Sequence, residues 1–143
     1  MSPSVLLDTG PILAMLNRQD RWYGRCTQTF IQLHKPLLTS EAVLTEAFYM
    51  LGDSAHRVEA AWTFVRSGAI TVGTISDKDL PALAQLMQQY QDRPMDFADA
   101  TLVRLAEREQ LTSILTIDFS DFETYRIDGR KRFRILPGTV RQP

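Results

Sequence analysis

The chain has 143 residues, of which 44% are hydrophobic and 23% are charged, so it has the length of one domain and enough apolar residues for a packed core. This composition excludes a disordered chain and a collagen-like fibre. The net charge of -1 gives no overall field that would attract nucleic acid or a membrane surface. The single cysteine excludes an intrachain disulfide, and no apolar run approaches the roughly 18–20 residues of a membrane span. We expect one cytoplasmic domain over residues 1–143, with no signal peptide and no contact with a membrane.

The spacing of apolar and turn residues predicts short strands that alternate with longer helices. In chain order the expected elements are a strand over 5–7, helices over 12–16 and 22–33, a strand at 37–38, a helix from residue 39 or 40 to 51, a helix over 54–66, a strand over 69–72, helices over 77–90 and 95–109, a strand over 113–117 and a last strand over 133–136. This alternation predicts an α/β fold with a mainly parallel central sheet of four to five short strands flanked by helices, and a core over about 5–136.

Two aspartates follow predicted strands. Asp8 comes directly after the strand over 5–7, and Asp118 comes directly after the strand over 113–117. In an open parallel sheet, ligands bind beyond the carboxyl ends of the strands, so two strands that each end in a carboxylate indicate a site there. Either aspartate alone is better explained as the cap of the following turn, which is a common position for Asp.

Asp99 falls on the apolar face of the predicted helix over 95–109. At about 100° per residue, it lies within the stripe that includes Leu102 and Leu105. A buried carboxylate must meet a cation or hydrogen-bond donors, or be protonated, because burying it unpaired costs several kcal/mol. Asp96 has a structural explanation as the N-cap of this helix, with Asp99 as the third helical residue. A capping role does not require an inward side chain, so we choose Asp99 over Asp96 as the functional acid.

Glu46 lies beside the apolar stripe of its predicted helix, and alone it would be an ordinary surface residue. As a set, Asp8, Glu46, Asp99 and Asp118 are four carboxylates with no lysine among their neighbouring residues. Converging carboxylates repel one another unless a cation lies among them. Oxygen ligands without His or Cys favour Mg²⁺ or Mn²⁺ over zinc. Such a site suits phosphoryl chemistry, because the ion polarises the phosphate and activates a water.

Basic residues are concentrated near the end of the chain. Six of the sixteen lie in the last eighteen positions: Arg126, Arg130, Lys131, Arg132, Arg134 and Arg141. One interpretation is a solvated edge strand, which charged side chains protect from unwanted pairing. The other is a phosphate-binding surface in which Arg130 and Arg132 contact the substrate. Composition does not choose between the two.

Four segments resemble, in family order, the motifs of the PIN domain, the nuclease fold of VapC-type toxins. The segments are 5–14 (VLLDTGPILA), 39–47 (TSEAVLTEA), 95–103 (MDFADATLV) and 114–122 (ILTIDFSDF). Each motif is short, but the set spans nearly the whole chain. The resemblance implies a metal-dependent endoribonuclease in which the acids of these segments hold Mg²⁺ or Mn²⁺ and a water attacks the RNA phosphodiester.

The resemblance also assigns individual roles. It implies that Asp8, Glu46, Asp99 and Asp118 are the catalytic and metal-binding acids. It gives supporting roles to two hydroxyls and two further acids: Thr9, Thr116, Asp96 and Asp121. It further implies a homodimer and, for the toxin of a type II toxin–antitoxin system, a cognate antitoxin protein.

Two alternative functions stay open from the sequence. The first is a PIN-like module that binds nucleic acid without significant turnover. The second is a Mg²⁺-dependent phosphatase or a receiver-type phosphoacceptor on an α/β sheet. A receiver would need a lysine after a late strand, and the segment 114–122 contains none.

Overall fold

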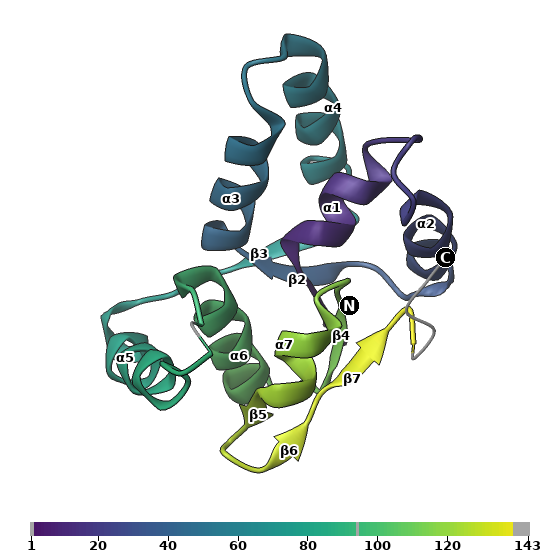
Figure 1. The fold of residues 1–143 in the computed structure, drawn as a ribbon. Helices are drawn as coiled ribbons and strands as arrows, with labels where there is room; N and C mark the ends of the chain where they lie inside the picture. Colours follow the sequence, from purple (N-terminus) through teal and green to yellow (C-terminus); the bar gives the residue numbers. More distant parts are fainter. Residues whose placement is uncertain (1, 94, 139–143) are drawn as a thin grey trace.

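The computed structural model describes residues 2–93 and 95–138, which form an α/β fold around one parallel sheet. Its strands are ordered β3-β2-β1-β4-β7, and helices pack around them (Figure 1). The strands are β1 (Val5–Leu7), β2 (Leu37–Ser40), β3 (Ile70–Gly73), β4 (Ser113–Leu115) and β7 (Arg134–Leu136). The predicted fold class is therefore confirmed, while the extent of a single domain over residues 1–143 stays a prediction.

Seven helices and one hairpin complete the described part of the chain. The helices are α1 (Thr9–Met15), α2 (Tyr23–Gln32), α3 (Glu41–Leu51), α4 (Ala55–Val65), α5 (Leu80–Gln89), α6 (Phe97–Glu109) and α7 (Phe119–Thr124), with a 3₁₀ turn, η1 (Asp77–Asp79), before α5. Strands β5 (Arg126–Ile127) and β6 (Lys131–Arg132) pair antiparallel as the hairpin. None of the described helices is long and apolar enough to cross a membrane.

Parallel pairing places the carboxyl ends of the strands together at one edge of the sheet and their amino ends at the opposite edge. Leu6 of β1 pairs with Leu38 on one side and with Ile114 on the other, and Ile114 pairs with Ile135 of β7. All these pairs are parallel, so the residues that follow β1, β2 and β4 leave the sheet at the same edge. This is the edge at which ligands bind in open parallel sheets.

Helix α6 lies at the centre of the core. Its residues Ala100, Leu102, Val103, Leu105 and Ala106 are completely buried. Burial of each larger apolar side chain stabilises the fold by about 1.5–3 kcal/mol. The helix ends where Gln110 adopts the left-handed conformation at φ 58°. Because α6 is packed on nearly all sides, its first turn is fixed relative to the sheet.

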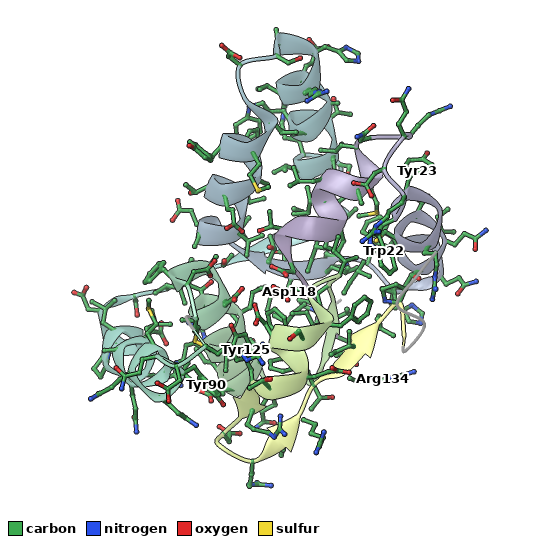
Figure 2. The ribbon with its side chains drawn as sticks, in the orientation of Figure 1. Trp22, Tyr23, Tyr90, Asp118, Tyr125 and Arg134 are labelled. Carbon is green, nitrogen blue, oxygen red and sulfur yellow. The ribbon has the colours of Figure 1, made fainter. Side chains whose placement is uncertain are left out.

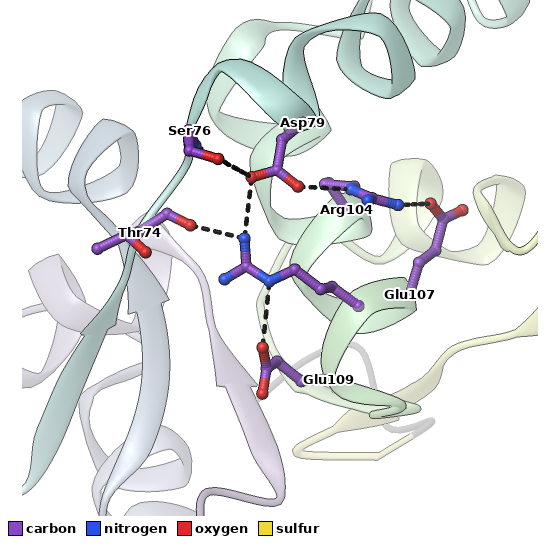
Figure 3. Close-up of polar contacts among 7 residues, drawn as sticks. Thr74, Ser76, Asp79, Arg104, Glu107 and Glu109 are labelled. Carbon is purple, nitrogen blue, oxygen red and sulfur yellow. Dashed lines mark hydrogen bonds and ion pairs between the residues drawn. The ribbon is translucent and has the colours of Figure 1, made fainter.

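A partly buried ion-pair network, centred on the buried Asp79, attaches the start of α5 to α6 (Figure 3). Asp79 accepts hydrogen bonds from Arg104 Nε at 2.9 Å and from Arg108 Nη1 at 3.0 Å. Its Oδ2 also accepts the backbone N–H of Ser76 at 3.0 Å, and Arg108 donates to the Thr74 carbonyl at 2.8 Å. The bond from Ser76 and the neighbouring arginines hold the pKa of Asp79 below its usual value.

The structure corrects several predicted boundaries. Helix α1 begins at Thr9 rather than residue 12, and the element expected over 77–90 is a 3₁₀ turn followed by α5. Strand β4 ends at Leu115, so Asp118 does not follow the strand directly as expected. The reason is that the Thr116 hydroxyl bonds to the Asp118 N–H at 2.9 Å, which turns the chain out of the sheet.

The sequence analysis did not predict α7 or the β5–β6 hairpin. These elements have six residues or fewer, which is too short for apolar periodicity to distinguish them from loops. The aromatic residues of this region, Phe119, Phe122 and Tyr125, are all buried in the core, so none is free to stack on a base.

Candidate active site

Six acidic residues meet in one hollow beyond the carboxyl ends of β1 and β4. The hollow has a volume of about 250 Å³. Its lining consists of the acids Asp8, Glu46, Asp96, Asp99, Asp118 and Asp121 together with Thr9, Gly10, Leu13, Met50 and Ile117. The structure thus brings together all four acids that the sequence analysis selected, and both of the acids to which it gave supporting roles. Neither His nor Cys nor any basic side chain is among these described lining residues.

Asp8 follows β1 and is held by a hydroxyl from the end of β4. Thr116 Oγ1 donates to Asp8 Oδ2 at 2.8 Å. Thr116 Oγ1 also accepts the N–H of Asp118. The Asp8 N–H itself donates to the Leu115 carbonyl at 3.0 Å. Burial raises the pKa of Asp8 to about 6, and the nearby carboxylate of Glu46 adds to the rise, although the bond from Thr116 opposes it.

Glu46 enters the hollow from α3. That helix begins after Ser40, whose hydroxyl accepts the N–H of Val43 at 3.1 Å and so caps the first turn. Thr9 Oγ1, from the first turn of α1, donates to Glu46 Oε1 at 2.7 Å. This bond explains how a half-buried glutamate beside the apolar stripe is directed toward Asp8 rather than toward solvent.

Asp96 and Asp99 occupy the two positions expected for them at the start of α6. Asp96 is the N-cap, and its Oδ1 accepts the N–H of Asp99 at 2.7 Å. Asp99 points inward and is only 9% exposed. Its Oδ2 accepts a hydrogen bond from Tyr125 Oη at 2.8 Å. Burial raises the pKa of Asp99 to about 8, and repulsion from Asp8 and Asp96 contributes to the rise.

Asp118 and Asp121 lie at the start of α7 on the outer side of the hollow. Asp118 is the N-cap, and the N–H of Asp121 donates to its Oδ1 at 3.4 Å. Asp121 is paired with Arg93, whose Nη1 lies 3.1 Å from its Oδ1 and also donates to Ser120 Oγ at 2.8 Å. Desolvation raises the pKa of Asp118 to about 6, and the neighbouring carboxyl of Asp121 adds to the rise, although the backbone N–H of Asp121 opposes it.

Three of these acids are close enough to share one cation. Asp99, Asp118 and Asp121 each offer an oxygen, and the three oxygens lie within 4.8 Å of one another. Asp121, to which the sequence analysis gave a supporting role, therefore belongs to the tightest cluster, while Asp8 and Glu46 line the same hollow outside it. A site made only of carboxylates fits Mg²⁺ or Mn²⁺ rather than zinc. A cation would lower the raised pKa values of Asp99 and Asp118.

Arg130 and Arg132 are not part of this hollow. Strand β7 runs parallel to β4 with Arg134 opposite Ser113, so the β5–β6 hairpin lies beyond the amino ends of these strands, away from the acids. Figure 2 shows Arg134 beside β7, apart from Asp118. Arg130 and Arg132 are both exposed, and their contact with a substrate stays a prediction. Arg141 lies outside the described residues.

Three residues that the sequence analysis missed support the acids. Tyr125 bonds to Asp99 and Arg93 bonds to Asp121, but Tyr125 directly follows the short helix α7 and Arg93 lies between α5 and α6, and no local pattern predicts either contact. Gly10 is the third: a Cβ there would lie 2.6 Å from Ile117 Cγ1, next to Asp118. No local pattern in the sequence indicates this close approach of residue 10 to Ile117.

Comparisons with known proteins show which proteins this chain resembles. No family model matches the chain. The chain is 26% identical over 136 residues to Ribonuclease VapC26 of Mycobacterium tuberculosis, an alignment that covers 93% of this chain and 100% of the relative. The crystal structure of M. tuberculosis VapC20, a toxin that cleaves the sarcin-ricin loop, superposes with a TM-score of 0.73 at 20% identity, over 82% of this chain and 94% of that one. The resemblance to PIN-domain proteins of the VapC type is thus confirmed, and the fold is that of VapC20.

The raised pKa values predict how stability depends on pH when no divalent metal is bound. The carboxyls of Asp8, Asp99 and Asp118 hold protons in the folded protein to about pH 6, 8 and 6. The same groups release them near pH 4 in the unfolded chain. The folded state therefore binds more protons between these limits, so the free energy of unfolding falls as pH rises from about 4 to about 8.

Urea denaturation in EDTA at about pH 5 and about pH 8 measures this loss. We expect Asp99→Asn to remove a large part of the loss, and Mg²⁺ or Mn²⁺ to restore stability at the higher pH. Equal stability of the parent protein at both pH values would contradict the electrostatic description of the hollow.

Proposed function

We propose that this protein is a metal-dependent endoribonuclease that hydrolyses RNA phosphodiester bonds and acts as the toxin of a type II toxin–antitoxin system. One observation supports this proposal above the others. Four separate segments deliver six carboxylates to a single hollow at the carboxyl edge of a parallel sheet, with no basic residue among the described lining. Similarity to a ribonuclease over that relative's whole length supports RNA as the substrate.

The proposed roles follow from the positions of the acids. Asp8, Glu46, Asp99 and Asp118 would hold Mg²⁺ or Mn²⁺ and form the catalytic set, with Asp96 and Asp121 beside them. When bound, such an ion polarises the phosphate and lowers the pKa of a water. The chain's own contribution is orientation, because hydroxyls of Thr9 and Thr116 fix the carboxylates of Glu46 and Asp8. The outer position of Asp118, which is exposed, leaves one side of the hollow open to a phosphodiester.

The two alternatives differ from this proposal in measurable ways. A binding module would retain RNA without metal-dependent cleavage. A receiver-type domain would present a lysine to its phosphoacceptor, and the described lining of the hollow contains none. A phosphatase would release phosphate from small monoesters and leave RNA intact. Incubation with RNA and with a small phosphomonoester therefore distinguishes the nuclease, the binding module and the phosphatase.

The proposed function predicts which acids are catalytic. The purified protein should cleave mixed RNA with Mg²⁺ or Mn²⁺ and not with EDTA. Asp99→Asn should abolish cleavage while the metal-free protein stays as stable as the parent or becomes more stable, because the substitution relieves repulsion from Asp8 and Asp96. Gel analysis of the RNA and urea denaturation measure the two effects.

Asp96→Asn is the matched control for Asp99→Asn. Asparagine caps helices about as well as aspartate, so this change keeps the start of α6 while it removes one charge from the hollow. We expect Asp96→Asn to retain much more activity than Asp99→Asn. Full activity of Asp99→Asn would show that our choice between the two acids is wrong.

Arg130 and Arg132 remain proposed partners for RNA that extends beyond the hollow. The association constant for RNA falls as the salt concentration rises. Each substitution that removes an arginine–phosphate contact should make the slope of log K against log salt less steep by about 0.7 for a single strand. The measurement compares Arg130→Ala/Arg132→Ala with Arg57→Ala/Arg66→Ala, all in an Asp8→Asn background that prevents cleavage. The control removes two exposed arginines at α4. A slope that changes equally in both double variants, or in neither, would contradict the proposal.

A homodimer belongs to the same proposal, and the structure offers a surface for it. An apolar hollow of about 600 Å³ adjoins the acids, since Glu46 and Asp96 line both. Tyr49, which is 85% exposed, and Phe97, which is 49% exposed, lie at this hollow. We propose that a second copy of the chain covers it, because large exposed apolar side chains next to a site mark an interface.

Light scattering should then give twice the chain mass of 16.3 kDa. Tyr49→Glu should shift the protein to monomer, because it places a charge in the interface. Ile31→Glu is the control, since Ile31 is 68% exposed on α2, outside the lining of the apolar hollow. A monomeric parent, or a dimer that Tyr49→Glu leaves intact, would contradict this interface.

A cognate antitoxin protein is also part of the proposed function, and we assign no surface to it.

A further inference from the structure

A buried tyrosine holds the most buried of the clustered acids. Tyr125 is completely buried, and its Oη donates to Asp99 Oδ2 at 2.8 Å. The other carboxylate oxygen, Asp99 Oδ1, accepts no hydrogen bond from any residue in the described ranges 2–93 and 95–138. The carboxylate is therefore fixed through one oxygen, with the second left available.

We propose that Tyr125 is a positioning residue that orients Asp99 so that its free oxygen faces the cation site. This inference rests on the proposed function, because it concerns the metal that the acids would hold. Partners that orient metal ligands act through such hydrogen bonds to the ligand's second atom. Tyr125 would touch neither the metal nor the RNA, so its effect passes through Asp99.

The ring of Tyr125 is fixed from two sides, which gives the hydroxyl one direction. It makes edge-on contacts with Tyr90 and Phe122, each with ring centroids 5.1 Å apart. Its backbone N–H donates to the Asp121 carbonyl at 3.0 Å, at the end of α7. In Figure 2 Tyr125 lies between Tyr90 and Asp118. A hydroxyl on so constrained a ring cannot follow Asp99 if the carboxylate rotates.

Helix α7 connects this contact to the rest of the cluster. Asp118 caps the start of the helix, Asp121 lies in its first turn, and Tyr125 follows its last residue. Helix α7 and its two flanking residues thus position two of the three clustered acids, Asp118 and Asp121, directly. They position the third, Asp99, through the Tyr125 hydroxyl. One rigid element would set the geometry of all three oxygens.

Tyr125→Phe tests the inference because it removes the hydroxyl and keeps the ring contacts. The probe is Mn²⁺ alone, with affinity measured by electron paramagnetic resonance on the RNA-free protein. We expect the dissociation constant for Mn²⁺ to rise about 10–100-fold, as for other partners of metal ligands. In cleavage assays, kcat at low Mn²⁺ should fall, KM for RNA should change little, and excess Mn²⁺ should restore the rate.

Tyr90→Phe is the matched control. It also removes one tyrosine hydroxyl from the same aromatic group, but Tyr90 Oη accepts the backbone N–H of Arg126 at 3.0 Å and contacts no acid among the described residues. We expect this variant to bind Mn²⁺ as the parent does, whatever stability it loses. Unchanged Mn²⁺ affinity in Tyr125→Phe, or an equal loss in both variants, would overturn the proposal.

A double-mutant cycle distinguishes positioning from general destabilisation. If Tyr125 acts through Asp99, then Tyr125→Phe should cause no further loss of Mn²⁺ affinity in an Asp99→Asn background. A full, additive loss in that background would contradict the inference. The readout also separates the two proposals: a parent that binds Mn²⁺ but cleaves no RNA contradicts the proposed function and leaves the Tyr125 effect intact.

Discussion

Burial of several carboxylates in one hollow, where they also repel one another, is the constraint on which the candidate site depends. Asp8, Asp99 and Asp118 all have raised pKa values, and burial is the first cause for each. A fold tolerates such an arrangement only if other interactions support it, and here the support is the packing of α6, most of whose residues are buried, and of β1 and β2, which are buried throughout. The packed core thus holds the acids close together although burial and mutual repulsion disfavour their charged forms. Such arrangements are common at functional sites.

Two kinds of buried aspartate in this chain show how partners decide the role of a charge. Asp79 is surrounded by Arg104 and Arg108, and its pKa is lowered. Asp8 and Asp99 instead receive neutral hydroxyls, from Thr116 and Tyr125. A hydroxyl orients a carboxylate without cancelling its charge, whereas an arginine does both. The Asp79 network therefore stabilises the packing of α5 on α6, and the hydroxyl-held acids keep a charge that a cation can use.

Sequence patterns predicted the acids better than they predicted what holds them. Asp99 could be placed inward from helical periodicity, and Asp8 from its position after a strand, because both patterns are local. Glu46 had no such signal, since its direction depends on Thr9, which is 37 residues away. The sequence left the basic residues near Arg130 open between an edge strand and a phosphate-binding surface, and parallel pairing of β7 with β4 puts them beyond the amino ends of these strands, away from the acids. Register between distant strands is a tertiary property, and no local pattern determines it.

Helix α7 illustrates how far the geometry of the site depends on tertiary packing. A helix of six residues is not stable alone, because nucleation costs more than so few hydrogen bonds return. Here it is held by Phe119, which packs against Trp22, and by Phe122, which packs against Phe133. Trp22 directly precedes α2 and Phe133 directly precedes β7, so α7 is fixed by residues that do not line the hollow. The placement of Asp118 and its neighbours is therefore a consequence of aromatic packing behind the site as much as of the acidic motif itself.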